Sequence, residues 1–280
     1  MVLIFGVLKG VREVVKKKSL EKSSVMEVLI LYTLLGFLMV VPDYKNAMGV
    51  SSNLMIMIAL KSFVIFVAWM CSFKAIDKMP ISLYGVLDLS RVLFATLLGT
   101  VVLKEALSIP QIIGLVFVST GLLMLKGRGT ERNVSSNNKK LPAKYVMIAV
   151  ISCMLNALSG LLDKVLMKSV NSSQLQFWYM LFLVLMYIIY ILITNTKIRW
   201  KMVFKNYWIW LLSLLFIIAD RALFIANGIA DSKVTVMTLI KQSGCLVTIL
   251  AGKFIFKETN IRYKLLCAAI VIVGIVIAVM

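Results

Sequence analysis

Long apolar runs alternate with short polar segments along the whole chain. The runs are about 20 residues long, which is enough for a helix to cross the hydrocarbon core of a bilayer, about 30 Å thick. The strands of a membrane barrel would instead be ~10-residue segments of alternating hydrophobicity. The pattern therefore predicts ten membrane-spanning helices, at residues 1–15, 25–41, 53–73, 81–103, 110–125, 145–168, 175–194, 207–229, 234–256 and 262–280.

The second half of the chain repeats the first. At one constant offset the matching residues are Ser90 and Ser243, Gly99 and Gly252, Lys104-Glu105 and Lys257-Glu258, and Gly121 and Gly274. We therefore expect two repeats of one five-helix unit, residues 1–125 and 145–280, joined by a basic linker loop at 126–144. Because each unit has an odd number of spans, the second unit enters the membrane from the opposite side. The expected fold class is an all-α polytopic membrane protein with two inverted five-helix repeats.

Composition favours a membrane protein and argues against several other classes. The chain is 61% hydrophobic and only 15% charged, whereas soluble domains are about half apolar. The net charge of +19 does not indicate nucleic-acid binding, because the basic residues cluster between the apolar runs, where the positive-inside rule places them. There is no histidine, and all four cysteines lie inside apolar runs. We therefore expect no catalytic residue, metal site or cofactor.

The charges of the loops predict an orientation. Most of the 31 Lys and Arg residues lie in or beside the loops that follow the odd-numbered spans. The opposite side holds only Lys45, Lys104, Lys168 and Lys233. The positive-inside rule then places the odd loops in the cytoplasm and both termini outside. We expect a multi-pass protein of a bacterial plasma membrane, a monomer or homodimer, whose partners are membrane lipids and a small-molecule solute.

Small residues predict a contact between the fourth and ninth spans. Ala95 and Gly99 form a small-xxx-small pair, and Thr248 and Gly252 occupy the equivalent positions of the second repeat. Such pairs let two helix backbones approach closely in lipid. Any one pair could arise by chance, but its recurrence in both repeats favours a contact. Gly6 and Gly10 form a third pair.

The stretch from Lys74 to Leu125 resembles the signature end of an EamA domain, of the drug/metabolite transporter superfamily. Glu105, Gln111, Gly114 and Gly121 stand where that signature has its Glu, its Gln-x-x-Gly and its later Gly. The second copy departs from the signature, because Lys264 and Cys267 replace the Gln and the first Gly. The resemblance implies ten helices, a central cavity between the repeats and transport of small organic solutes by alternating access. It also implies cytoplasmic termini, in disagreement with the charge pattern.

Charged residues inside the spans are candidates for the substrate path. A charge near the bilayer centre costs at least about 2.5–3.5 kcal/mol, so it normally faces a cavity or a partner. The candidates for substrate binding are Asp88, Arg91, Asp220, Arg221, Lys241 and Lys61, with Tyr84, Trp69, Asn156 and Asn227 as polar and aromatic neighbours. Arg12 and Glu13 join them if the first span crosses the membrane.

Each candidate also has a structural interpretation. Asp88 and Arg91 are three residues apart and can form a structural ion pair, and we expect Asp88 to contact Arg91 or Lys241. Lys61 could snorkel to an interface, and a surface pair or snorkelling is the expected account of Asp163 and Lys164. The aromatic side chains could simply pack the bundle.

Two further positions follow from helix geometry. Asp220 and Arg221 are adjacent and point about 100° apart on a helix, so at least one needs a partner elsewhere. Glu105 and Glu258 precede turns between helices, where we expect a structural cap rather than chemistry.

These features favour a secondary transporter of a small polar organic solute, such as an amino acid or a related metabolite, with export one possible direction. Protonation of Asp88 or Asp220 could couple transport to a proton gradient. The sequence holds no nucleotide-binding loop of the G-x-x-x-x-G-K-[ST] type. The missing histidines argue against a membrane-embedded enzyme. The alternative is a flippase for an amphipathic lipid carrier.

Overall fold

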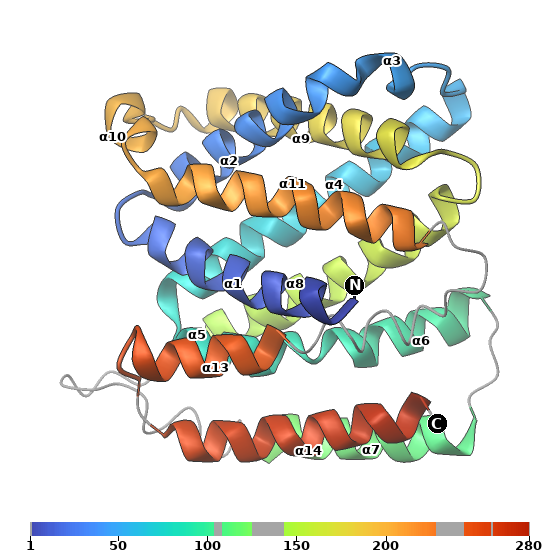
Figure 1. Ribbon diagram of the computed structural model, residues 1–280, viewed down its shortest axis with the longest axis vertical. Coiled ribbons are helices and arrows are strands. Elements are labelled where there is room, and N and C mark those ends of the chain that lie inside the picture. Colours follow the sequence, from blue (N-terminus) through green and yellow to red (C-terminus); the bar gives the residue numbers. More distant parts are fainter. Residues whose placement is uncertain (1, 104–107, 125–142, 228–243, 259, 280) are drawn as a thin grey trace.

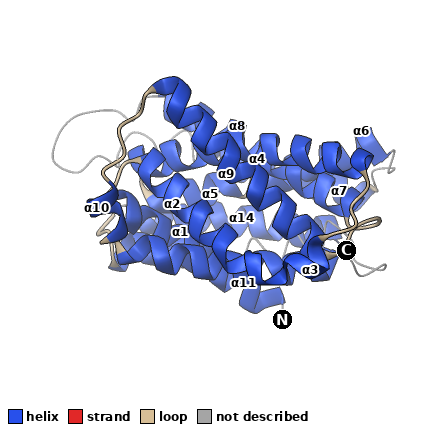
Figure 2. Ribbon diagram, turned by 90° about the horizontal axis from the view of Figure 1, so that it is seen from above, coloured by secondary structure: helices blue, strands red, loops and turns tan. Residues whose placement is uncertain are grey.

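The computed structural model describes residues 2–103, 108–124, 143–227, 244–258 and 260–279. Every regular element within these ranges is a helix (Figure 2). The helices are stacked along the longest axis of the molecule, from α2 and α9 at one end to α7 and α14 at the other (Figure 1).

The helices follow the predicted order. The first half contains α1 (Val2–Leu20), α2 (Val25–Val40), the 3-10 turn η1 (Val41–Asp43), α3 (Tyr44–Ala47), α4 (Ser52–Lys78), α5 (Ile81–Asp88), α6 (Arg91–Leu103) and α7 (Ile109–Met124). The second half contains α8 (Ala143–Leu166), α9 (Ser172–Thr194), α10 (Trp200–Phe204), α11 (Tyr207–Asn227), α13 (Gly244–Phe254) and α14 (Ile261–Val279).

Six helical segments of the described chain are long and apolar enough to cross a membrane. They are Val25–Ala47, Ser52–Lys78, Ile81–Val102, Ala143–Leu166, Ser172–Thr194 and Tyr207–Ile225, and each overlaps a predicted span. Their outer surface is apolar: the side chains of Val101, Leu192 and Ile193 are 77%, 73% and 79% exposed. Such a surface is suited to lipid and not to water. The chain is therefore a polytopic membrane protein.

Local sequence signals explain several helix ends. Ser24 accepts a hydrogen bond from the backbone N–H of Glu27 at the start of α2, and the Glu27 carboxylate accepts one from the Ser24 N–H. Asn171 and Gln174 form the same capping box at the start of α9. Each box satisfies backbone donors that a helix N-terminus leaves free. The C-terminal cap of α9 is Asn195, in a left-handed conformation at φ 52°.

Contacts between the two halves are reciprocal. Helix α1 packs on α11 and α13, while α8, its equivalent in the second half, packs on α4 and α6. Helix α2 packs on α11, and its equivalent α9 packs on α4. The pairs α2–α9 and α7–α14 join equivalent helices directly, and α5 packs on α13, the equivalent of α6. Most of these contacts therefore have a counterpart when the halves are exchanged.

The fourth predicted span is broken, which corrects the expectation of one continuous helix at 81–103. The backbone N–H groups of Leu89 and Ser90 donate to Val86 O and Leu87 O, three residues back, so the last turn of α5 tightens and ends. A new helix, α6, then begins at Arg91. As a result Asp88 lies at the negative end of the α5 dipole and Arg91 at the positive end of α6, where each charge is disfavoured unless it has a partner.

The predicted contact between the fourth and ninth spans is confirmed, and the predicted ninth-span pair, Thr248 and Gly252, makes it, but the predicted fourth-span pair does not. Gly85 of α5 lies against Thr248 of α13, and Gly252 lies 3.0 Å from Ser82 Cβ, measured from where a Cβ would stand. The small pair at Ala95 and Gly99 is on α6, which packs on α8 instead. The break after Asp88 explains the difference, because it separates the two parts of the span.

Glycines bring other helices equally close. A Cβ on Gly10 of α1 would stand 2.6 Å from the backbone oxygen of Gly244 on α13. A Cβ on Gly121 would stand 3.0 Å from the Cys267 oxygen, and one on Gly274 would stand 2.8 Å from the Gly114 oxygen. The signature glycines of the sequence thus serve the α7–α14 interface. Close backbone approach is a main source of helix association in lipid.

The acidic residue of the second copy caps a helix of the first, as expected for Glu258. Its Oε1 accepts a 2.6 Å hydrogen bond from the Ile81 N–H, and Oε2 accepts from the Ser82 N–H at 3.3 Å and from the Ser82 hydroxyl, all at the start of α5. Lys264, which is fully buried, donates to Ser82 Oγ at 2.6 Å and to Glu258 Oε2 at 3.2 Å. Lys264 thus neutralises the carboxylate. Glu105, the equivalent residue, lies outside the described residues.

Two equivalent glycines provide a matched test of packing. Gly10→Ala should lower the free energy of unfolding by about 1–3 kcal/mol, because its methyl group would overlap Gly244. Gly160→Ala should be neutral or stabilising by up to about 1 kcal/mol, because a methyl group there meets no described atom within 4 Å and alanine favours helix. Unfolding of the purified protein by SDS titration measures both. Equal losses for the two variants would contradict the α1–α13 contact.

The buried pair of Glu258 and Lys264 predicts strong coupling. Glu258→Gln keeps one acceptor oxygen for the α5 cap but leaves the Lys264 ammonium buried without its anion, so it should destabilise the protein by about 3 kcal/mol. In the Lys264→Met background the same change should cost at least about 1 kcal/mol less. A double-mutant cycle in the same titration measures the difference. Additive losses would mean that the two side chains act independently.

Candidate functional site

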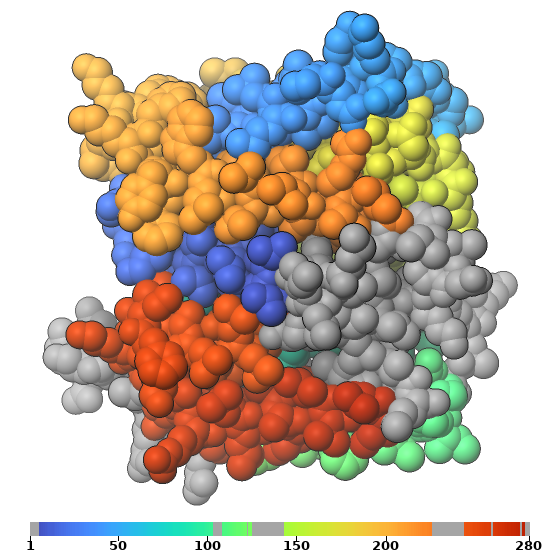
Figure 3. Space-filling view, viewed as in Figure 1, coloured from blue at the N-terminus to red at the C-terminus, as the bar shows by residue number. Residues whose placement is uncertain are grey.

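One face of α1 carries four charged residues into the interior of the bundle. Lys9, Arg12, Glu13 and Lys16 are spaced by three or four residues, so they share a helix face. Helix α1 lies between α11 and α13, as the space-filling view shows (Figure 3). Glu13 forms an ion pair with Lys16 at 2.7 Å and a longer one with Arg12 at 3.8 Å. The first predicted span therefore brings charge into the protein rather than into lipid.

Asp88 is held between two cations. Its Oδ2 lies 2.6 Å from Lys9 Nζ and its Oδ1 lies 2.6 Å from Arg91 Nε. The Cys153 thiol donates a weak hydrogen bond to Oδ1 at 3.9 Å. The expected contact with Arg91 is present, whereas Lys241 lies outside the described residues. These ion pairs balance the charges that the break between α5 and α6 leaves at unfavourable helix ends.

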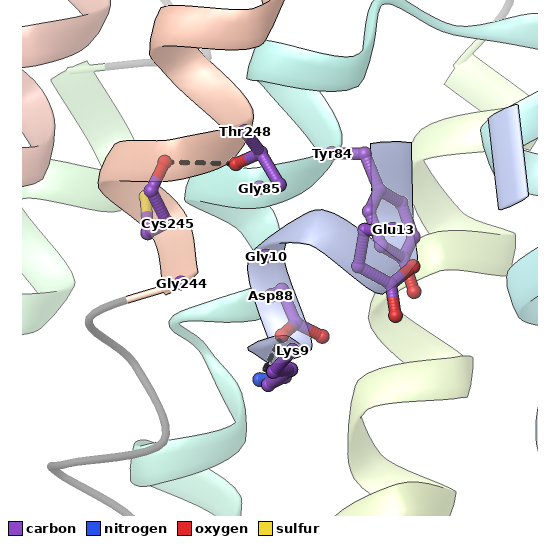
Figure 4. Close-up of a pocket in the computed structure, with 9 residues that line it drawn as sticks. All are labelled: Lys9, Gly10, Glu13, Tyr84, Gly85, Asp88, Gly244, Cys245 and Thr248. Carbon is purple, nitrogen blue, oxygen red and sulfur yellow. Dashed lines mark hydrogen bonds and ion pairs between the residues drawn. The ribbon is translucent and has the colours of Figure 1, made fainter. Parts of the chain in front are cut away.

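A small pocket adjoins this cluster, between α1, α5 and α13 (Figure 4). It is lined by Lys9, Gly10, Glu13, Tyr84, Gly85, Asp88, Gly244, Cys245 and Thr248. Figure 4 shows Lys9 directed at Asp88, and the lining glycines Gly10, Gly85 and Gly244 come from α1, α5 and α13. Tyr84 is fully buried, and its hydroxyl hydrogen-bonds to Ser72 Oγ at 2.7 Å. The pocket draws its walls from both halves of the chain.

A second polar cluster joins α4, α8, α9 and α11. Lys61 is 2% exposed; its ammonium lies 3.1 Å from Asp163 Oδ1 and 3.5 Å from the centre of the Tyr179 ring. The Tyr179 hydroxyl in turn donates a hydrogen bond to Asp220 Oδ2. Lys61 therefore does not snorkel to an interface. The expectation that Asp163 is a surface residue is wrong: it is 7% exposed, because α8 packs on α4 and turns it inward.

Aromatic rings pack beside the charged face of α1. The rings of Tyr32, Trp69 and Phe216 lie 5.0–5.2 Å apart, centre to centre. Arg12 lies over Phe216 at 5.5 Å, and Lys16 lies over the ring of Phe73 at 4.7 Å. Cations over aromatic faces gain about 0.5–2 kcal/mol where they are desolvated. Trp69 thus packs in the bundle against Tyr32 and Phe216.

Arg221 points away from these clusters. It forms an ion pair with Asp43 at 2.6 Å and donates hydrogen bonds to Ser173 Oγ at 2.7 Å and Gln176 Oε1 at 3.2 Å. Asp220 and Arg221 therefore find separate partners on other elements, as expected from their angular separation. Arg221 ties α11 to η1 and α9 and has a structural role in this arrangement.

The remaining candidates are not brought to the charged clusters. Asn156 donates hydrogen bonds to Ser152 O at 2.7 Å and Ser152 Oγ at 3.2 Å, one turn earlier on α8. Asn227 is the last residue of α11, and its side chain lies outside the described part of the protein. No group of three or more His, Cys, Asp or Glu side chains that could hold a metal occurs among the described residues.

Sequence reasoning missed Lys9 and Lys16 as members of the site. Their spacing with Arg12 and Glu13 was a usable signal, because four charges on one face of an apolar helix indicate a buried polar face. Asp163 was missed because its distance from the end of a span says nothing about which neighbour covers it.

The ion pairs of Asp88 predict a large contribution of this residue to the free energy of unfolding. Asp88→Asn leaves Lys9 and Arg91 buried without their shared anion and should lower the free energy of unfolding by about 3–5 kcal/mol. Asp77→Asn is the matched control, since that carboxylate pairs with exposed Lys78 and its loss should change stability by at most about 0.5 kcal/mol. SDS titration of both variants checks the difference. An unchanged Asp88→Asn protein would contradict the ion-pair geometry.

Comparison with known proteins agrees with these features. Residues 1–126 match the model of the EamA-like transporter family. No curated protein matches the chain. One of the solved structures that match is a crystal structure whose sequence is 12% identical to this chain. Its TM-score is 0.64, and the alignment covers 99% of this chain and 96% of that one. At this identity the likeness shows the fold alone. The resemblance to the EamA-like transporter family is therefore confirmed for the first half of the chain, residues 1–126.

Proposed function

We propose that the protein is a secondary transporter that moves a small polar organic solute across a bacterial plasma membrane by alternating access. Ten helices in two inverted repeats would form the transport path. The observation that carries the proposal is the buried charge shared by both halves. Lys9, Asp88 and Arg91 come from the first half, and Asp163 and Asp220 come from the second. Charges inside a membrane bundle mark a substrate or ion path by default, because their burial is costly.

The inverted repeat is supported by the reciprocal helix contacts. In transporters of this kind, each repeat adopts one of two arrangements, and exchanging them switches the open side. The equivalent glycines support such a difference, since Gly10 touches Gly244 while its counterpart Gly160 faces open space within the described residues. The equivalent of Gly244 in the first repeat is Arg91. At this position the α1–α13 interface is tight, whereas the equivalent position of α8 leaves open space among the described residues.

The charge balance of the interior favours a zwitterionic solute. The charged residues of the α1 face and of the Asp88 and Lys61 clusters are the cations Lys9, Arg12, Lys16, Lys61 and Arg91 and the anions Glu13, Asp88, Asp163 and Asp220. Five cations thus face four anions. A nearly neutral interior favours a solute with both an ammonium and a carboxylate, such as an amino acid or a related metabolite, over a simple anion.

Of the two carboxylates considered for proton coupling, Asp220 has the better surroundings. Protonating Asp88 would leave Lys9 and Arg91 without their shared anion. Asp220 instead has a neutral hydrogen-bond partner, the Tyr179 hydroxyl, and no cation within 4.0 Å among the residues described. A proton can therefore be gained or lost there without unpairing two buried cations. We assign Asp220 the coupling role.

Proteoliposomes test the proposed function. The purified protein should accumulate one or more radiolabelled amino acids or related zwitterions, with uptake that depends on an imposed pH gradient. Asp220→Asn should remove the dependence on the gradient, and Asp88→Asn should lower uptake at least about tenfold. Asp77→Asn, outside the interior, should transport normally.

Two results would contradict the proposal. One is that no solute is moved or bound, while a fluorescent lipid crosses between leaflets at a rate that Asp88→Asn reduces, which would favour a flippase. The other is transport that neither Asp88→Asn nor Asp220→Asn changes, which would place the path elsewhere.

A further inference from the structure

Arg12 is a partly buried cation whose hydrogen-bonding capacity is not used. Its guanidinium makes no hydrogen bond to any described residue, and its Nε is buried without a partner. Its nearest carboxylate oxygen is Glu13 Oε1 at 3.8 Å, and Glu13 is engaged more closely by Lys16 at 2.7 Å. A buried guanidinium has five donors in a planar fork, and leaving them unpaired is costly. Arg12 therefore has N–H donors available for an additional hydrogen-bond acceptor.

Asp220 is the complementary case on the facing helix. One carboxylate oxygen accepts from Tyr179, and the other has no hydrogen bond to the residues that the structure describes. No described cation lies within 4.0 Å, although Arg12 and Lys61 are close enough to interact with it electrostatically. Asp220 follows Phe216 by four residues on α11, so both lie on the face that α1 covers. Since Arg12 lies over the Phe216 ring, Arg12 and Asp220 face the same region without touching.

The other interior charges are matched. Each of the following lies within 3.1 Å of an opposite charge: Lys9, Asp88 and Arg91; Glu13 and Lys16; Lys61 and Asp163. Among the described charges of the α1 face and of the Asp88 and Lys61 clusters, only Arg12 and Asp220 lack such a partner. A molecule placed between them would need an anionic group for Arg12 and a cationic group for Asp220.

We propose that Arg12 and Asp220 form the two ends of a zwitterion-binding site, in which Arg12 binds a carboxylate and Asp220 binds an ammonium group. This inference rests on the proposed transport function and names its substrate class as α-amino acids. The planar guanidinium suits a carboxylate because it can donate two parallel hydrogen bonds. Tyr32, whose ring lies 5.1 Å from Phe216 and whose hydroxyl makes no hydrogen bond among the described residues, supplies a further polar group.

The neighbouring rings give the site an apolar wall. Trp69 and Phe216 lie 5.0 Å apart, edge to face, on α4 and α11. An apolar or aromatic side chain of the amino acid would contact these rings, while its charged groups face Arg12 and Asp220. Because Arg12 is on α1 and Asp220 on α11, the bound molecule would bridge the two halves of the protein. Binding would therefore act on the interface that alternating access must rearrange.

A thermal-shift measurement on the purified full chain in detergent tests the site. The probes are the common L-α-amino acids, each added singly, because a ligand raises the melting temperature by mass action. The amino acid that gives the largest shift is then compared with two analogues, one lacking the amino group and one lacking the carboxylate. We expect the intact amino acid to bind at least roughly 30-fold more tightly than either analogue, as the loss of a buried charge contact implies.

Two variants give readouts that a structural role would not produce. In Arg12→Gln the amino acid and its decarboxylated amine should bind equally, and in Asp220→Asn the amino acid and its deaminated acid should bind equally. Arg12→Lys, which keeps the cation, should recover part of the preference for the carboxylate. Asp77→Asn should bind as the unmodified protein does. The comparison between analogues is made within each variant, so a general loss of stability does not mimic the result.

The outcomes separate this site from the transport function. Suppose that an amino acid stabilises the protein but both variants keep the preference of the unmodified protein for the intact amino acid over its analogues. That result would overturn the Arg12–Asp220 site, and the proposal that the protein transports amino acids would stand. If the protein transports or binds only solutes that lack one of the two charges, the zwitterion assignment is overturned and the transport function stands. If no solute binds or is transported in proteoliposomes, both proposals fail.

Discussion

The high cost of an unpaired charge inside a bilayer is the constraint on which the rest of this structure depends. Helix α1 carries four charged residues on one face, and that face must be covered by protein. It lies between α11 and α13 and directs Lys9 at Asp88. The ion pairs of Asp88, with Lys9 and Arg91 at 2.6 Å each, also stabilise the break between α5 and α6. Electrostatics thus determines where α1 sits and where the fourth span can be interrupted.

Close backbone packing supplies the attraction that the bilayer cannot. Helices in lipid gain little from the hydrophobic effect, so small residues at their crossings matter. Gly10 with Gly244, Gly85 with Thr248, and Gly121 with Cys267 each bring two backbones together at a contact between the halves. This packing places the charged residues of α1 and α5 within reach of their partners. Packing and electrostatics therefore support each other.

Polar contacts join the two halves at several places. Glu27 accepts two hydrogen bonds from the Arg199 guanidinium, Glu258 caps α5, and Lys61 pairs with Asp163. Hydrogen-bonded and ionic contacts can be exchanged for others of similar energy more readily than a fully interdigitated apolar core can be rearranged. An interface of this kind is suited to two arrangements of nearly equal stability. That property is what the proposed transport cycle requires of it.

The sequence by itself determined the helices, their order and their approximate limits, because the length and apolarity of each run follow from the thickness of a bilayer. It also indicated the repeat, the contact between the fourth and ninth spans and the capping role of Glu258, since each leaves a local or periodic signature. Only the tertiary structure decided which residue each charged side chain pairs with. Lys9 and Asp88 are 79 residues apart in the chain, and the burial of Asp163 depends on α4. No local pattern specifies which helix covers a given face, because that choice is made by packing and charge pairing over the whole bundle.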